Sequence, residues 1–368
     1  MVFYASPSLR VATAPITDGP LDMGNLTATL RIGIKEALLG IGFPTRALRR
    51  FDQSIILFYH AIGEGGVPAK SFEKQLCYLQ RHFEMIFASE VDTPSPSGRL
   101  RVAITFDDGL KNTKDVALPI LQKLGIKATL FALPGNVRWL WTAEMRERLE
   151  AAMADETIID AMPPLRDARD IDRVIEDMKT MSHDALVAAI ARIRNATSFE
   201  PSPAWRSKHE LMNAEELRAL PTDLIEIGAH TLTHPILPHV EDDWLEREIV
   251  DSKHQLEAVL QRQVTTLSYP NGGFDQRCLE IASRHYDYAF TTETAIGDFD
   301  DQQVLKGHKH AINRLHGVDH QAEMPLRMLR FLTNGHGFSA QPTAGAAVTA
   351  GPDQEETPGY EIPAVMQK

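Results

Sequence analysis

The 368-residue sequence contains only two cysteines, Cys77 and Cys278, and lacks any long apolar run. Two cysteines exclude a dense disulfide framework and a zinc module built from thiolates, so a bound metal would need His, Asp or Glu ligands. No segment approaches the ~20 apolar residues that a membrane-spanning helix requires. The N-terminus also lacks a basic start followed by an apolar run, which argues against a signal peptide. We therefore expect a cytoplasmic protein without a transmembrane segment.

Positive charge is scarce as well. The chain has 38 Lys and Arg against 50 Asp and Glu, and a formal net charge of −12. No basic stripe is present that could displace counterions from phosphate, so we expect no nucleic-acid partner. The 43% hydrophobic and 24% charged residues are ordinary for a globular protein. This length and composition favour one catalytic domain with appendages.

Between residues 51 and 335, short apolar runs alternate with stretches of helical period, which is typical of βα units around a parallel sheet. About seven runs are strand candidates: Ser54 to His60, Arg101 to Phe106, Lys127 to Leu133, Asp223 to Ala229, Val264 to Tyr269, Asp287 to Thr291 and Ala311 to Leu315. Helices are predicted after most of them, at Ser71 to His82, Lys114 to Leu124, Asp243 to Gln261 and Gln276 to Arg284.

Three further segments differ in character from these units. Residues 1–50 are expected to form an N-terminal extension that packs on the main domain, and residues 336–368 a disordered tail. Residues 134–222 read as a helical insertion, with helices near Thr142 to Ala154, Asp170 to Lys179 and Ser182 to Asn195. Trp139 and Trp141 at its start could stack on sugar rings, although an apolar anchor to the main domain is the more frequent role.

Polar clusters begin where three of the predicted strands stop. They are TFDDG at residues 105–109, HTLTHP at 230–235 and SYPNG at 268–272. In a barrel of parallel strands the carboxyl ends all open onto one face, where such enzymes build their sites. The three clusters are therefore expected to converge.

Two of these clusters contain candidate metal ligands. Adjacent like charges, as at Asp107 and Asp108, are costly unless a cation or a proton compensates, although an Asp-Gly turn in solvent would also explain them. His230 and His234 have an i, i+4 spacing that can bring two imidazoles to one point, and imidazole with a carboxylate is a usual donor set for Zn, Co, Ni or Fe(II). Two ordinary polar histidines beside a turn-forming proline are the alternative.

The spacing of the two histidines is not specific by itself, because His316 and His320 share it. That second pair flanks a loop-like segment and has no aspartate pair nearby. The first pair follows a strand candidate directly. Context therefore favours His230 and His234 as ligands.

The segments TFDDG, HTLTHP and SYPNGG, in this order, resemble the first three motifs of the polysaccharide deacetylases, the NodB-homology enzymes of carbohydrate esterase family 4. The early FYHAIG at residues 58–63 is similar to one branch of that family, and the resemblance covers roughly residues 51–335. It implies an α/β fold, a distorted (β/α)7 barrel of the NodB-homology type, here with a helical insertion.

The resemblance also implies residue roles. Asp107 would be the general base, and Asp108, His230 and His234 would hold a divalent metal, Zn in the first place with Co or Ni as alternatives. The substrate would be an acetylated amino-sugar oligomer or polysaccharide, such as a chitooligosaccharide or an exopolysaccharide, and the products acetate and a free amine. The chain would thus be a hydrolase acting on a carbon–nitrogen bond other than a peptide bond.

The sequence departs from the family pattern in two places. Ser268 stands where the third motif commonly has an arginine that orients the catalytic aspartate, and we expect Arg314 to supply that cation instead. The late Leu-x-His motif with the general acid is missing from its usual place, and His316 is the replacement we predict. His60, Tyr269, Pro270, Asn271 and Arg314 complete the predicted substrate-binding residues.

Two other hypotheses stay open on these residues. The departures would also suit a catalytically inactive carbohydrate-binding module, which would bind glycans without releasing acetate. A metal amidohydrolase acting on a small or lipid-linked amide would share the same ligands. The retention of Asp107 together with all three ligands favours an enzyme, since a decayed site usually loses one of these groups.

Overall fold

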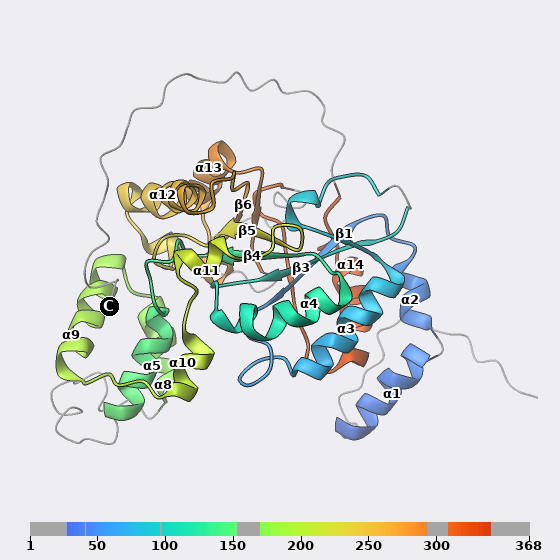
Figure 1. Ribbon diagram of the computed structural model, residues 1–368, viewed down its shortest axis with the longest axis horizontal. Helices are drawn as coiled ribbons and strands as arrows, with labels where there is room; N and C mark the ends of the chain where they lie inside the picture. The colour runs from blue at the N-terminus through green and yellow to red at the C-terminus, as the bar shows by residue number, and fades with distance from the viewer. Residues whose placement is uncertain (1–27, 41, 96–97, 153–169, 293–307, 340–368) are drawn as a thin grey trace, which may run out of the picture.

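The computed structural model describes residues 28–40, 42–95, 98–152, 170–292 and 308–339. The described chain forms an α/β fold around one parallel sheet (Figure 1). Its strands are β1 (Ser54–Tyr59), β2 (Glu84–Ile86), β3 (Arg101–Phe106), β4 (Ala128–Ala132), β5 (Ile225–Ala229), β6 (Thr266–Ser268), β7 (Tyr288–Phe290) and β8 (Leu315–His316). None of its helices is both long and apolar enough to cross a membrane.

The strands follow the order β7-β6-β5-β4-β3-β1-β8, with β2 paired to β3 outside this path. A parallel bridge between Phe290 and Ile312 joins β7 to the residues just before β8, so the two ends of the sheet meet. Seven strands thus lie around a closed path, as expected for a distorted (β/α)7 barrel. The fold class predicted from the sequence is confirmed.

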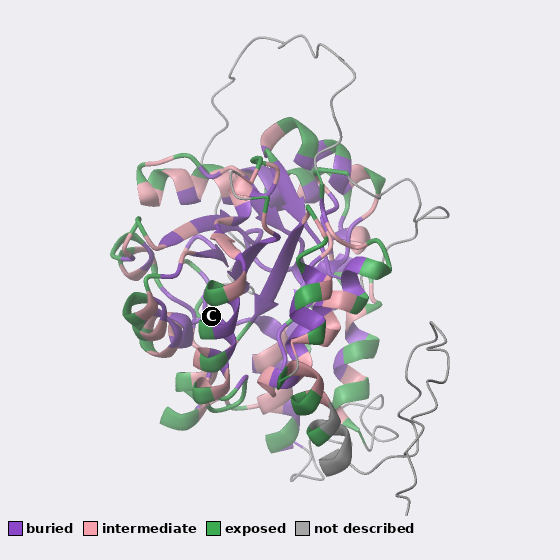
Figure 2. Cartoon of the chain, turned by 90° about the vertical axis from the view of Figure 1, so that its right-hand side faces the viewer, coloured by how far each residue is buried: buried purple, intermediate pink, exposed green. Residues whose placement is uncertain are grey.

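Burial explains why the strands could be located from the sequence. Every residue of β1, β3 and β4 is buried, so each strand is a near-continuous apolar run, as is usual for parallel strands covered on both faces. Figure 2 shows these buried strands at the centre and the exposed residues on the outer sides of the helices.

Amphipathic helices cover the sheet. In α3 (Ala69–His82), Phe72, Leu76 and Leu79 form the buried stripe at helical spacing. The other helices of the barrel are α4 (Leu118–Leu124), which follows a π-helical turn at Thr113–Ala117, α11 (Ala214–Arg218), α12 (Asp242–Leu260), α13 (Gln276–His285) and α14 (Met324–Thr333). Asp275 caps α13, because its carboxylate accepts from the amide of Cys278 at 3.0 Å.

The segment before β1 forms α1 (Ala28–Gly40) and α2 (Phe43–Leu48). Leu48 is fully buried in the main core, and Thr45 shares a hydrogen bond with the hydroxyl of Tyr78 at 2.7 Å. At the other end, Phe338 pairs with Ser54 of β1 through two backbone hydrogen bonds. Residues 1–27 and 340–368, which include most of the predicted tail, lie outside the described residues.

The insertion contributes α5 (Trp141–Ala152), α8 (Ile171–Lys179), α9 (His183–Ala196) and α10 (Pro203–His209), which gather at one side of the molecule, away from α1 to α3 (Figure 1). It has a small core of its own, with Trp141, Met145, Ile175 and Ile190 among its members. A buried Glu144 binds Arg148 and Arg194 within it. The insertion therefore holds its own shape beside the barrel.

Candidate active site

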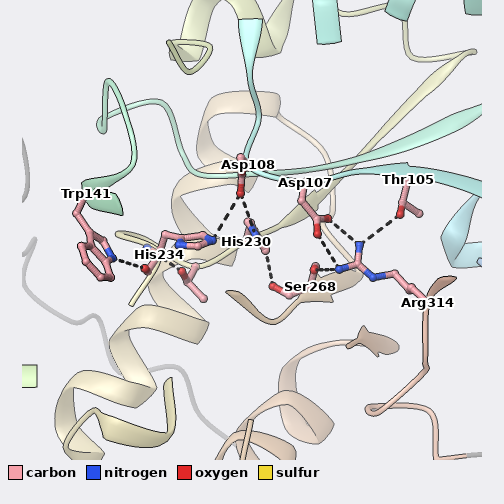
Figure 3. A network of polar contacts seen from close by, with 9 residues as sticks. Thr105, Asp107, Asp108, Trp141, His230, His234, Ser268 and Arg314 are labelled. Carbon is pink, nitrogen blue, oxygen red and sulfur yellow. Dashed lines mark hydrogen bonds and ion pairs between the residues drawn. The ribbon is translucent and has the colours of Figure 1, made fainter. Parts of the chain in front are cut away.

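The three polar clusters of the sequence meet at the carboxyl ends of β3, β5 and β6. Asp107 and Asp108 follow β3, His230 follows β5, and Ser268 ends β6. Arg314 directly precedes β8, which pairs with β1. Because β3, β5 and β6 run parallel and close together in the sheet, their ends bring these side chains to one place (Figure 3).

Asp108, His230 and His234 form a cluster whose ligand atoms all lie within 4.8 Å of one another. The Nε2 atoms of His230 and His234 lie 3.4 and 3.5 Å from Oδ1 of Asp108. All three residues are buried. Two imidazoles and one carboxylate are the donor set that several catalytic zinc sites use, with a further position left for water or substrate.

The surroundings of the two imidazoles fit a metal. Nδ1 of His230 lies 2.7 Å from the backbone oxygen of Ser268, a contact that places the ring proton there and leaves the lone pair of Nε2 for a ligand bond. Burial lowers the pKa of His234 to about 4, so this imidazole is neutral at pH 7, the form that binds metal. The residues present therefore suit a divalent cation.

The backbone at the site adopts conformations that side chains rarely accept. Among the described residues, five other than glycine have positive φ, and four of them belong to the clusters: Asp108 (72°), Thr231 (65°), His234 (60°) and Asn271 (55°). For a β-branched residue such as Thr231 this is a marked outlier. Strain of this kind persists only where the surroundings impose it, and it concentrates at functional sites.

Two neighbours support the strained loop of His230 to His234. Glu248 of α12 is fully buried, and its carboxylate accepts from the amides of Leu232 and Thr233 and from the hydroxyl of Thr233 at 2.6–3.0 Å. Trp141 of the insertion donates from its indole nitrogen to the backbone oxygen of His234 at 3.2 Å (Figure 3). The barrel and the insertion thus both hold this loop.

Asp107 is held by a guanidinium fork. Nη1 and Nη2 of Arg314 donate to the two carboxylate oxygens of Asp107 at 2.7 and 2.8 Å (Figure 3). The same guanidinium donates to Ser268 Oγ at 2.7 Å, to Thr105 Oγ1 at 3.3 Å and, from Nε, to the Thr291 carbonyl at 3.1 Å. A bidentate Arg–carboxylate pair fixes direction as well as distance.

Charge keeps both aspartates ionised. Burial raises the pKa of each, but for Asp107 the charges of Arg314 and His230 outweigh it and hold the pKa below its ordinary value. For Asp108, the contact with His230 and the nearby His60 and His234 outweigh burial and hold the pKa well below the ordinary value. At neutral pH, Asp107 is a carboxylate and can accept a proton.

His60 and His316 stand at the mouth of the site, and both are exposed. Their ring centroids are 6.2 Å apart, and the His316 ring lies against Phe58 at 4.9 Å. Partial burial of the ring, followed by the charge of His60, lowers the pKa of His316. Both histidines line a cavity of about 740 Å³ together with Asp108 and Asn271.

A second cavity, of about 650 Å³, is lined by Asp107, His230, His234, Pro270 and Asn271. Every predicted metal and catalytic residue therefore borders one of the two cavities. Pro270 and Asn271, predicted as substrate contacts, do so as well.

Two predicted substrate contacts lie elsewhere. Tyr269 is fully buried, stacks on Phe274 with ring centroids 4.9 Å apart, and donates its hydroxyl to the His310 carbonyl at 2.9 Å. Arg314 is also fully buried, against the ring of Phe58 at 4.8 Å. Neither is among the residues that line the two cavities described above, so Tyr269 belongs to the core and Arg314 acts on the site through Asp107.

The sequence did not predict the contacts that four residues make at the site. Thr105 and Ser268, both inside the motifs, share the guanidinium of Arg314, and Trp141 was assigned only to sugar stacking or to anchoring. Glu248 could have been found from its position, because it lies on the buried stripe of α12 with Leu245, Ile249 and Ser252. A glutamate on an apolar face signals a buried polar contact.

The family of the chain follows from comparison with known proteins. The model of the polysaccharide deacetylase family matches residues 95–162 and 167–289, about half of the chain. The chain belongs to this family. Arg314 and His316 lie beyond the matched residues.

Individual relatives are more distant. YxkH of Bacillus subtilis (strain 168), whose name gives it as a polysaccharide deacetylase, is 24% identical over 248 residues, which are 65% of this chain and 64% of YxkH. The deacetylase PplD of Streptococcus pyogenes, solved with acetate, is 19% identical, with 75% of this chain and 97% of PplD covered and a TM-score of 0.48. IcaB from Ammonifex degensii is 15% identical, with 76% and 97% covered and a TM-score of 0.48.

Proposed function

We propose that this protein is a metal-dependent N-deacetylase of an amino-sugar oligo- or polysaccharide, of the chitooligosaccharide or exopolysaccharide type. One observation carries the proposal: an ionised carboxylate, Asp107, is clamped by Arg314 beside a buried cluster of two histidines and one aspartate. Family membership supplies the reaction class. The donor set of Asp108, His230 and His234 favours Zn, with Co or Ni as alternatives.

Hydrolysis of an unactivated amide needs a nucleophile stronger than water and a partner for the developing oxyanion. A metal held by Asp108, His230 and His234 would lower the pKa of a bound water and polarise the acetamide carbonyl. Asp107 takes the proton from the attacking water at a carboxylate oxygen, while Arg314 and Ser268 keep that carboxylate in position. Its ionised state at neutral pH, which Arg314 maintains, is the state that this step requires.

The remaining steps fall to residues at the mouth. His316 lines the cavity and, in its imidazolium form, gives a proton to the amine nitrogen as the carbon–nitrogen bond breaks, which leaves a neutral imidazole and a free sugar amine. Backbone N–H groups near Asn271 donate to the oxyanion, and His60, Pro270 and Asn271 contact the sugar that carries the acetamide. The protein thus supplies a base, an acid and a lined cavity around one carbonyl.

The test is acetate release from N-acetylglucosamine oligomers and from acetylated exopolysaccharide. We expect release with added Zn, Co or Ni, none after chelation, and none from Asp107→Asn although this variant still binds metal. Small acetamides in the same assay separate a polysaccharide deacetylase from an amidohydrolase of small amides. Full activity in Asp107→Asn or in a His230→Ala/His234→Ala double variant would refute the proposal.

A further inference from the structure

The helical insertion forms one wall of the candidate active site. The two cavities share Leu140, Thr142 and Lys179 from the insertion on one side, and His60, Asp108 and Asn271 from the barrel on the other. Because they share these residues, the cavities adjoin and form a single cleft that extends to both sides of Asp108. A substrate bound at Asp108 has space for further units in two directions.

Lys179 lies at the junction of this cleft. It is the last residue of α8, and its Nζ contacts Oε1 of Glu176 at 2.7 Å. Glu176 lines the cleft as well. The helix is anchored by Ile175 and Met178, which are buried in the core of the insertion with Trp141. The position of Lys179 is therefore fixed relative to the loop of His234, which Trp141 also contacts.

A lysine and a glutamate in contact suit neighbouring hydroxyl groups. The ammonium group only donates hydrogen bonds and the carboxylate only accepts them, whereas each hydroxyl does both. Two adjacent hydroxyls of a sugar ring can therefore bind one to each partner. The side chains of Lys179 and Glu176 are 24% and 61% exposed, so both can be reached from the cleft.

The charge along the cleft argues against an anionic substrate. Three of its lining residues are lysine or arginine, namely Arg146, Lys179 and Lys208. Each has an acidic partner: Arg146 contacts Asp172, Lys179 contacts Glu176, and Lys208 contacts Glu64 at 2.9 Å. Sites for phosphate or carboxylate gather cations that are free to bind the ligand. In this cleft, each of the three cations is already paired with an acidic side chain.

We infer that the insertion binds a neutral, hydroxyl-rich glycan and that Lys179 and Glu176 contact a sugar beyond the one that carries the reacting acetamide. This inference rests on the proposed deacetylase function and narrows its substrate class. It makes Lys179 a specificity-determining residue that takes no part in proton transfer.

The experiment compares Lys179→Met and Glu176→Gln with Arg173→Met. The control residue lies on the same helix, is 80% exposed, pairs with Asp177 and does not line the cleft. Substrates are methyl N-acetylglucosaminide, the neutral N-acetylglucosamine tetramer, and a tetrasaccharide in which N-acetylglucosamine alternates with glucuronic acid. The measurements are kcat and KM for acetate release.

We expect Lys179→Met to raise KM for the neutral tetramer about tenfold, which corresponds to ~1.4 kcal/mol, with kcat and the KM for the single sugar unchanged. Arg173→Met should match the wild type, and the wild type should prefer the neutral tetramer. Equal KM values for Lys179→Met and Arg173→Met, or a wild-type preference for the glucuronate oligomer, would overturn the inference.

Failure of the proposed function can be told apart from failure of this inference. If the wild type releases no acetate from any substrate, the deacetylase assignment fails. Calorimetric binding of the neutral tetramer then tests the inference directly. Weaker binding by Lys179→Met than by Arg173→Met supports it, and equal binding overturns it.

Discussion

Arg314 and Asp107 lie 207 positions apart in the sequence and form a two-pronged ion pair, with N–O distances of 2.7 and 2.8 Å, in the interior of the barrel. Both are buried, so neither charge is screened by solvent. A buried pair of this kind adds little net stability, but removal of one partner leaves an uncompensated charge. Its value here lies in holding one carboxylate in one direction.

Arg314→Lys tests that role. A lysine keeps the charge but cannot make two parallel hydrogen bonds, so Asp107 gains freedom to turn. We expect kcat for acetate release to fall on the order of 100-fold, the cost of a small misplacement of a reacting group, with KM and bound metal unchanged. A variant with wild-type kcat would show that the fork is not needed.

Metal removal should lower both activity and thermal stability. A ligand that binds only the folded state stabilises it by about 2.7 kcal/mol at a concentration 100 times its Kd. We expect Zn to raise the Tm of the chelated wild type but not that of a His230→Ala/His234→Ala variant. His316→Ala/His320→Ala, with the same histidine spacing, is the matched control and should respond as the wild type does. Loss of the Zn response in that control would place the metal elsewhere.

Glu248→Ala should destabilise the loop that carries His234. The change removes the acceptor of two amides and one hydroxyl, and each buried donor left unpaired costs about 1–3 kcal/mol. Chemical denaturation should show a lower free energy of unfolding, and metal titration a weaker affinity. Glu246→Ala, on the same helix with a side chain 59% exposed, should change neither. Similar losses in both variants would contradict the role of Glu248.

Asp275 predicts a dependence of stability on pH. Burial raises its pKa, but the amide of Cys278 and the side chain of Arg277 outweigh this, and the folded pKa lies below the ordinary 3.8. A carboxylate with a depressed folded pKa contributes stability above its unfolded pKa, and this is lost as pH falls through the folded value. We expect Asp275→Asn to have a lower Tm than the wild type at pH 7. Below pH 4 the difference in Tm between the two proteins should become smaller. A difference in Tm that does not change with pH would show that the ionised Asp275 carboxylate does not stabilise the fold.

The barrel could be predicted from the sequence because parallel strands that are buried on both faces give continuous apolar runs in the sequence. The predicted strand Arg101 to Phe106 matches β3, and each of the other predicted strands overlaps an observed strand, although Ala311 to Leu315 shares only Leu315 with β8. The three-residue strand β2 was not predicted, because Glu84–Ile86 has neither a long apolar run nor an alternation of apolar and polar residues. The short helix α10 was not predicted either, because its seven residues are too few to show a helical periodicity of apolar residues.

For the site, the sequence could predict which residues lie at the ends of strands, but not the direction in which each side chain points. Tyr269 shows the limit: it sits inside the third motif, between Ser268 and Pro270, yet its side chain points into the core. Arg314 was expected to orient Asp107, but the geometry of their contact depends on a strand of two residues and a bridge at Ile312, which have almost no local signal in the sequence. Tertiary closure, rather than local propensity, decides where these side chains go.

The bridge between Phe290 and Ile312 also bears on the synthesis of the protein, because the segment that closes the sheet is the one that carries Arg314. A nascent chain that has emerged only as far as residue 310 already contains Asp107, Asp108, His230 and His234. It lacks the cation that compensates the buried charge of Asp107. The proposed metal ligands and the proposed base are thus translated before Arg314, so that the contact that holds Asp107 in place can form only after the closing strand has been made.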